Sequence, residues 1–249
     1  MPSEEAQQLD LPRDRQAAVA RILDAHRLYL ESERRDGQRA DLREFDLSDM
    51  AFVGIDLRRA RLARAMLDGS DWSRANLQRA NLSGASMRRT CLQGADLSMA
   101  RLSGAQLNRA VLAGARLDKA EMEFALLIEA DLADASLCGA DLSGANLEGA
   151  DLTRADLQGA NLRGANLRNA RLDNAVLRMA RLGGAVLTGA SLRDADLREA
   201  YLRVAKLDGA DLSGADLSDA IGVTLTEIEA ALRDGRTRLP RGPAGAGNG

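Results

Sequence analysis

Residues 140–149 read Ala-Asp-Leu-Ser-Gly-Ala-Asn-Leu-Glu-Gly, which is one five-residue unit written twice. The unit repeats 36 times from 40 to 219 without a gained or lost residue. The third position of every unit is apolar, with 32 Leu, two Met, one Phe and one Trp, and the first position is Ala in all but five units. A period this short and regular predicts a single solenoid, whose units bury their apolar side only against one another.

A period of five fits neither the helical period nor the two-residue period of a strand. It fits a chain that makes a short extended stretch and then turns, once in every unit. Four units would complete a circuit with four flat sides. We therefore expect the third-position Leu and first-position Ala to point inward. The other three positions are rich in Asp, Asn, Ser and Gly, and we expect them to point outward and form the turns.

The tandem Ala-(Asp/Asn)-Leu-X-X pattern of residues 40–219 resembles the pentapeptide repeat proteins, many of which are bacterial. The flanking segments, His26 to Leu42 and Leu225 to Pro240, are similar to segments that bracket many bacterial members. The resemblance implies an all-β solenoid, a right-handed quadrilateral β-helix in which 36 units make about nine four-sided coils. It also brings a functional precedent, because the best-understood members resemble duplex DNA and bind DNA gyrase.

Capping elements are expected at both ends, because an exposed terminal coil is a sheet edge ready to pair with another chain. Residues 12–36 have apolar residues at helical spacing and predict an amphipathic helix before Gly37, with His26 packed on its apolar side. A short helix is predicted from Thr224. One face of that helix is expected to cover the last coil or to form a homodimer, and it carries Leu225, Ile228 and Leu232.

These expectations divide the chain into three parts. They are a leader with a capping helix (1–39), the β-helix (40–219), and a short helix with a flexible tail (220–249), disordered from Arg241 onward.

The composition argues against catalysis and against bound cofactors. No stretch is long and apolar enough to span a membrane and the N-terminus lacks a signal sequence, so a cytoplasmic location is expected. One histidine, His26, and two separated cysteines, Cys91 and Cys138, suggest no general base, disulfide or metal site. We expect no enzyme activity, no cofactor, no small-molecule substrate and no membrane binding. Direct nucleic-acid binding is not expected either, since the chain lacks a basic balance and interleaved aromatics.

Charge is distributed unevenly along the predicted rod. Residues 60–119 carry a net charge of +6, and residues 160–209 carry +4. Between them, residues 120–159 hold nine acids and one base, a net charge of −8. We call this segment the acidic waist.

The waist also holds three large apolar side chains at outward positions, with acids around them. Such exposed apolar patches on soluble proteins often mark binding surfaces. The predicted protein-binding site consists of Glu121, Glu123, Phe124, Leu126, Ile128 and Glu129. The alternative is that the leader or the tail folds over the apolar side chains, or that the chain bulges and buries one of them.

Two hypotheses for the function follow from these observations. The first is a non-catalytic scaffold whose waist, 120–159, binds another protein. The second comes from the resemblance and is a DNA mimic that modulates DNA gyrase, by inhibiting it or by protecting it from quinolones. Duplex DNA as long as the rod, about 43 Å, would carry roughly 25 negative charges, whereas the repeats carry 26 acids against 23 bases. This balance favours the scaffold and leaves gyrase as one candidate partner.

Overall fold

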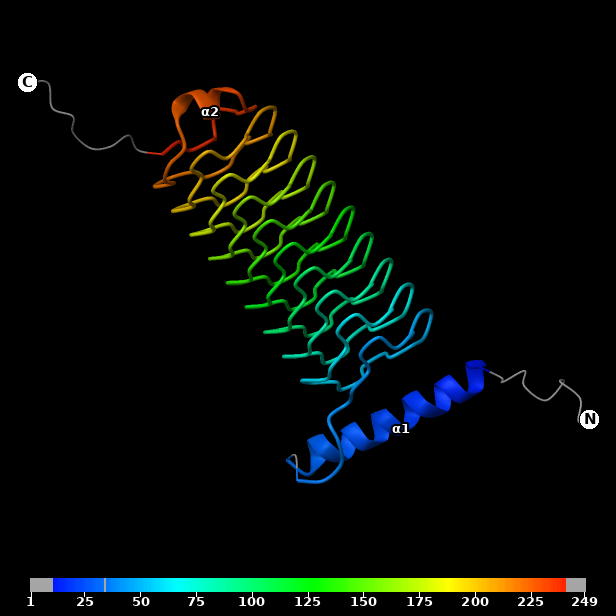
Figure 1. Cartoon of the computed structure of the whole chain (residues 1–249). Helices are drawn as coiled ribbons and strands as arrows, with labels where there is room; N and C mark the ends of the chain where they lie inside the picture. The colour runs from blue at the N-terminus through cyan, green and yellow to red at the C-terminus, as the bar shows by residue number, and fades with distance from the viewer. Residues whose placement is uncertain (1–10, 34, 241–249) are drawn as a thin grey trace, which may run out of the picture.

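Each five-residue unit forms one side of a square coil, and the coils stack into a straight rod (Figure 1). The structure is a computed structural model that describes residues 11–33 and 35–240. Helix α1 (Leu11–Glu31) lies across the N-terminal end of the rod, and helix α2 (Leu225–Glu229) lies at the C-terminal end (Figure 1). We name the four sides by their first units: side A starts with 40–44, side B with 45–49, side C with 50–54 and side D with 55–59.

A parallel backbone ladder with a 20-residue register holds the coils together. The second-position residue of each unit pairs with the residue 20 places later, from Asp41 with Arg61 to Tyr201 with Ile221. In a typical step, the Leu142 N–H donates to the Asn161 carbonyl at 2.7 Å. This register is the one expected for four units per circuit. Each unit contributes only an isolated bridge, because the chain turns again before a longer strand can form.

The corners are tight turns with one left-handed residue. The first-position N–H donates back to the third-position carbonyl, as from Ala145 to Leu142 at 3.0 Å. The fifth-position residue has φ between +53° and +73° in all 36 units, and only 15 of these residues are glycine. A left-handed conformation costs a residue with a Cβ roughly 1–2 kcal/mol. The ladder and the core therefore impose the turn on the other 21 residues.

The core is a column of side chains inside the rod. The third-position side chains are buried throughout, and so are the first-position side chains from Ala60 onward. Near the N-terminal end, the rings of Phe52 and Trp72 stack with centroids 4.3 Å apart. The indole N–H of Trp72 donates to Ser70 Oγ at 2.7 Å, which explains a polar residue at this inward position.

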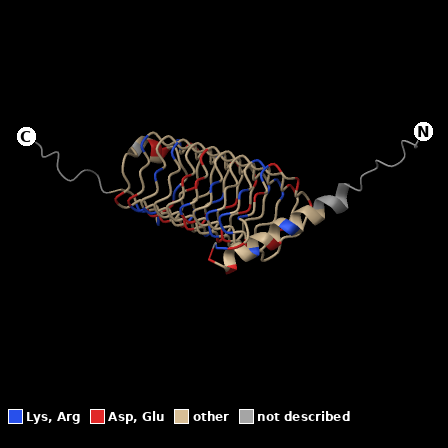
Figure 2. Ribbon diagram, turned by 60° about the horizontal axis from the view of Figure 1, so that its bottom comes forward, with Lys and Arg blue, Asp and Glu red and all other residues tan. Residues whose placement is uncertain are grey.

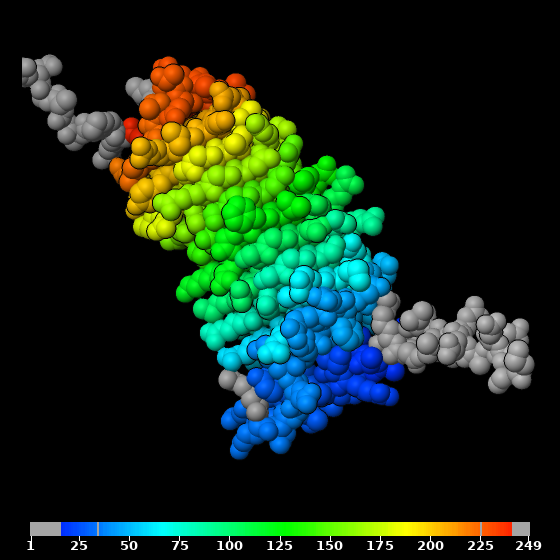
Figure 3. Space-filling model, viewed as in Figure 1, coloured from blue at the N-terminus to red at the C-terminus, as the bar shows by residue number. Residues whose placement is uncertain are grey.

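Helix α1 closes the N-terminal end of the core. Its residues Val19, Ile22 and Leu23 pack against the first coil, where large half-buried residues replace the usual alanine. Those residues are Phe45, Met50 and Ile55. The space-filling view shows α1 and the rod as one continuous packed body (Figure 3).

The C-terminal end of α1 differs from the prediction. The helix ends at Glu31 rather than near residue 36. The Asp36 N–H donates to Ser32 Oγ at 2.9 Å, and Gly37 turns the chain with φ +73°. This side-chain cap replaces the last helical turn. His26 is buried as predicted, and its Nδ1 accepts the Ala40 N–H at 3.0 Å.

The C-terminal cap combines a short helix with further ladder pairing. Thr224 caps α2 in a reciprocal pair with Glu227, and Ile228 is buried. The prediction that Leu232 shares a helical face with Ile228 is wrong, because α2 ends at Glu229. Leu232 is extended, pairs with Asp211 and is 63% exposed. The last coil needs partners for its backbone groups, and Leu232 supplies them.

Two further expectations at this end lie outside what the structure describes. They concern the side chain of Leu225 and the tail from residue 241.

Replacing Val204 with glycine should stabilise the rod. Val204 is an exposed β-branched residue at a left-handed corner, with φ +53°. Removing its Cβ should raise the free energy of unfolding by about 1 kcal/mol, measurable by urea denaturation. The matched control is Val186→Gly, at an extended ladder position, which should lower stability. A loss of stability in both variants would contradict this account of the corners.

Docking of α1 should weaken as pH falls below about 6.5. Burial is the largest influence on His26 and lowers its pKa below the ordinary value of 6.5. The unfolded chain therefore takes up a proton at a pH where the folded chain does not, so stability is lost as pH falls from 6.5 towards the lowered pKa. Thermal midpoints between about pH 7.5 and 5.5 should show this loss in the wild type. His26→Asn keeps an acceptor for the Ala40 N–H and should lack the slope; an unchanged slope would exclude His26 as its origin.

Candidate protein-binding site

Phe124 is a lone side chain on an otherwise bare corner of the rod. The corner between sides A and B is built from the fifth positions of side A. Within 84–184, this row holds one phenylalanine and five glycines: Gly84, Gly104, Phe124, Gly144, Gly164 and Gly184. A Cβ built on Gly104 or Gly164 would meet no atom within 4 Å. The corner therefore leaves open space around Phe124.

The ring of Phe124 leans towards the next coil and remains largely in solvent. A Cβ on Gly144 would lie 2.7 Å from Phe124 Cε1, so the ring covers that glycine. Phe124 is nevertheless 71% exposed and has φ +57°. An aromatic residue held in a strained corner with most of its surface in water is unfavourable for the isolated chain. This combination makes Phe124 the centre of the candidate site.

Leu126 and Ile128 continue the apolar surface onto side B, but to different extents. Leu126 is 36% exposed. Ile128 is half-buried, and its N–H donates to Asn108 Oδ1 at 3.1 Å. It borders a groove of about 340 Å³ whose other walls are Arg88, Arg89, Asn108, Arg109 and Glu129. The predicted outward trio therefore consists of two exposed side chains and one partly buried side chain.

Neither part of the alternative prediction for this patch holds in the described residues. The bridges from Glu121 to Asp141 and from Leu126 to Asn146 keep the 20-residue register, so the chain does not bulge. Helices α1 and α2 lie at opposite ends of the rod, away from its middle (Figure 1). No described part of the leader or the tail covers Phe124.

The acids of the waist are less free than their number suggests. Arginines of the neighbouring coils pair with four of them at 2.6–3.2 Å. The pairs are Arg101–Glu121, Arg109–Glu129, Arg154–Asp134 and Arg171–Asp151. The Arg154 guanidinium holds the pKa of Asp134 below its ordinary value through its hydrogen bonds. Figure 2 accordingly shows both signs of charge interspersed along the rod.

Glu123 is the acid beside Phe124 that makes no ion pair among the described residues. It accepts a hydrogen bond from Ser103 Oγ at 2.6 Å. The candidate site is thus an apolar knob, Phe124 with Leu126, with one unpaired carboxylate and a rim of paired charges.

Repeat signatures place the chain among known proteins. The family described as pentapeptide repeats matches it in overlapping stretches, at residues 38–71, 55–94, 95–132, 130–169, 150–189, 165–203 and 185–221. The chain belongs to the pentapeptide repeat family. Proteins of this family are generally non-catalytic and serve as structural or binding proteins. No curated protein matches the chain significantly.

Solved pentapeptide repeat structures resemble this chain over most of its length. HetL, involved in heterocyst differentiation regulation in the cyanobacterium Nostoc sp. strain PCC 7120, is 35% identical over 85% of this chain and 92% of its own, with a TM-score of 0.34. QnrB1, a plasmid-mediated fluoroquinolone resistance protein, is 19% identical over 76% of this chain and 94% of its own, with a TM-score of 0.50. The likeness to QnrB1 shows the fold alone.

The described part of this pentapeptide repeat protein has its potential metal-ligating side chains dispersed. It contains no group of three His, Cys, Asp or Glu residues placed to hold a metal ion. Cys91 and Cys138 are both free thiols, and burial is the main cause that raises the pKa of Cys138. Among the described helices, none is long and apolar enough to cross a membrane.

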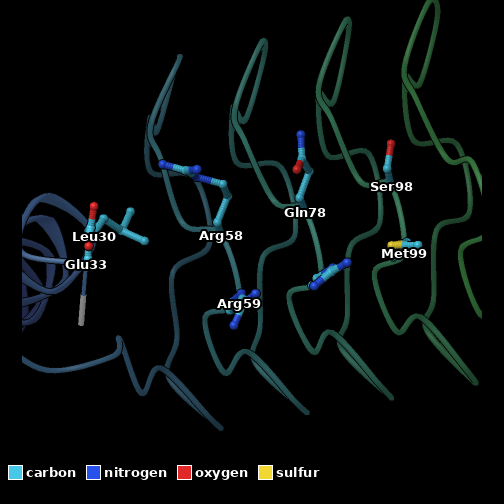
Figure 4. Close-up of a pocket in the computed structure, with 8 residues that line it drawn as sticks. Leu30, Glu33, Arg58, Arg59, Gln78, Ser98 and Met99 are labelled. Atoms are coloured by element: carbon cyan, nitrogen blue, oxygen red, sulfur yellow. The ribbon is translucent and has the colours of Figure 1, made fainter. Parts of the chain in front are cut away.

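Two features of the rod were missed by reading the sequence in order. One is the bare glycine corner around Phe124. The other is a groove of about 520 Å³ on side D beside the end of α1, lined by Arg58, Arg59, Arg79 and Met99 together with Leu30, Glu33, Gln78 and Ser98 (Figure 4). Both features emerge from the sequence only when residues 20 positions apart are read as one row.

Replacing Gly144 with alanine should disturb Phe124, whereas the same change at Gly164 should not. Both glycines are left-handed, with φ +65° and +64°, so each variant should lose about 1 kcal/mol through backbone strain. Only the Gly144 variant also pushes its Cβ into the Phe124 ring. Thermal unfolding should therefore rank Gly144→Ala below Gly164→Ala. Equal losses would mean that the ring does not rest on Gly144.

Proposed function

We propose that this pentapeptide repeat protein is a non-catalytic scaffold that binds another protein through Phe124 and Leu126. The observation that carries the proposal is the exposed aromatic knob on a corner stripped of other side chains. Burying such a side chain against a partner contributes roughly 1.5–3 kcal/mol. Interface hot spots are typically aromatic anchors inside a polar rim.

The surroundings of the knob suit a protein partner. Gly104 and Gly164 let a partner approach the rod backbone, since the space at their Cβ positions is open. The ion pairs of Glu121 and Glu129 fix charges beside the knob without requiring a counter-charge from the partner. Glu123 is available for a donor on the partner. The rod itself is rigid, so binding would require little ordering of the chain.

DNA mimicry directed at gyrase is the second candidate, and it has weaker support. A mimic needs a continuous row of unneutralised negative charge. Here four acids of the waist are paired with arginines, and bases occur along most of the rod. The likeness to QnrB1 concerns the fold and carries no residue-level support for gyrase binding.

A capture experiment with matched variants tests the scaffold. The double variant Phe124→Ser with Leu126→Asp should lose its partner from a bacterial lysate by at least about tenfold, as measured by quantitative mass spectrometry. The control is Val204→Ser with Val111→Asp, which changes the same repeat positions outside the waist; Val111 is 36% exposed, as is Leu126. The control should bind as the wild type does, and both variants should keep the wild-type thermal midpoint.

The same proteins separate the two candidates. If the scaffold binds a partner other than gyrase, the purified protein should neither change the supercoiling activity of gyrase nor bind gyrase at low salt. Retention of every captured protein by the double variant would refute the knob as the site. Inhibition or protection of gyrase that survives in the double variant would favour the mimic.

A further inference from the structure

Side D carries a charge pattern that becomes complementary when its direction is reversed. Its nine units, from 55–59 to 215–219, have net charges of +1, +1, −1, +1, 0, −1, +1, −1 and −2. Reversing this order places every charged unit opposite one of the other sign. The neutral unit, 135–139, then faces itself.

The corner row of side D shows the same order residue by residue. From the N-terminal end, its fifth positions are Arg59, Arg79, Met99, Lys119, Gly139, Gly159, Met179, Glu199 and Asp219. Reversal about Gly139 matches Arg59 with Asp219, Arg79 with Glu199, and Met99 with Met179. The two methionines are 42% and 43% exposed, so an apolar contact lies between the charged pairs.

The other three sides lack this property. Their central units are 120–124 on side A, 125–129 on side B and 130–134 on side C. These units carry net charges of −2, −1 and −2, so each would repel its own copy across a two-fold axis. Side D alone has a neutral centre, formed by Ser136, Cys138 and Gly139.

We propose that side D is the interface of an antiparallel homodimer whose two-fold axis passes beside Cys138 and Gly139. A two-fold axis that lies in the interface plane and runs across the rods sends each row onto itself with its direction reversed. This symmetry is therefore the one that matches positive units with negative units. A parallel pair would instead place units of like charge at the same height.

The unpaired cations of side D are where this dimer needs them, whereas Glu199 also meets Arg178 of its own chain at 3.4 Å. Arg59, Arg79 and Lys119 have no ion-pair partner among the described residues, whereas Arg58 is held by Asp56 at 2.7 Å. Arg59 and Arg79 line the groove of about 520 Å³ beside the end of α1 (Figure 4). In the dimer, this groove receives Asp219 and Glu199 of the second copy. At the C-terminal end, Arg238 pairs with Asp216 at 3.2 Å and offsets one of the two excess negative charges there.

The surface area of side D limits the strength of the dimer. A side about 43 Å long and about 10 Å wide presents roughly 430 Å² to its partner. Stable interfaces bury about 800 Å² per partner. The dimer is therefore weak, assembles at micromolar or higher concentrations, and depends on salt because its pairs are exposed.

The interface leaves the Phe124 knob accessible. Side D adjoins sides A and C, whereas the knob stands on the corner between sides A and B. The dimer thus presents two knobs directed away from its interface. Its existence does not rest on the proposed function, and each can fail without the other.

Charge reversal tests the pairing. Wild-type protein at about 100 μM should sediment as a dimer at about 50 mM salt and as a monomer at about 500 mM salt. Arg79→Glu and Glu199→Arg should each weaken the dimer by at least tenfold, because each removes both symmetry-related pairs. The double variant should restore it. Both positions keep a side chain at a left-handed corner, so backbone strain does not change.

A control substitution on another side of the rod accompanies this test. Arg89→Glu changes a fifth-position arginine on side B that, like Arg79, has no ion pair among the described residues, and it should leave the dimer intact. The proposal is overturned by a wild type that remains monomeric, by a double variant that fails to dimerise, or by dissociation in the Arg89 variant.

Cross-linking locates the axis independently. A short bis-maleimide should join two chains through Cys138, which lies beside the two-fold axis. Cys91 is a half-buried thiol on side C and serves as the internal control. Cross-linked dimers should therefore form in Cys91→Ser and be absent in Cys138→Ser. The reverse result would place the interface on another side.

Discussion

The ladder between residues 20 positions apart is the constraint on which the rest of the structure depends. Because a typical unit makes three backbone hydrogen bonds with each neighbouring coil, no unit can shift without breaking the pairing of all the coils beyond it. Leucine in the lumen and alanine at its corners keep the coil small enough for this register. The ladder also dictates the corners, and it holds even Phe124 and Val204 in a left-handed conformation. At these positions, the register of the ladder overrides the backbone conformation that the residue itself would prefer.

The period of the sequence predicted the four-sided coil and its inward rows, because period and burial are directly linked in a solenoid, and apolar spacing in the flanking segments predicted the caps. The ends were predicted less well. Helix α1 stops at Glu31 because Ser32 offers a side-chain cap, and Leu232 leaves the helix because the last coil still has unpaired backbone groups. The first outcome depends on a local side-chain hydrogen bond and the second on a tertiary contact, and apolar spacing along the chain reveals neither.

The candidate site was only partly predictable for a related reason. Phe124 and Leu126 were expected to be outward and are exposed, while Ile128 is half-buried next to the groove. Counting charges along the chain identified an acidic segment, but it could not show that Arg101 and Arg109 reach Glu121 and Glu129 on the following coil. Neighbours on this surface are separated by one whole coil of sequence, so a linear reading separates groups that touch.

The same register limits how such a rod can change in length. Deleting a single unit would leave the core intact but rotate everything beyond it by a quarter turn, moving every downstream residue to the adjacent side. Deleting a unit between residues 60 and 119 would move Phe124 to another corner row and divide side D between two sides. Only the gain or loss of four consecutive units preserves the rows. The core of a pentapeptide rod therefore tolerates the gain or loss of any number of units. A binding surface that spans several coils is preserved only when the chain gains or loses four units at a time, which is one whole coil.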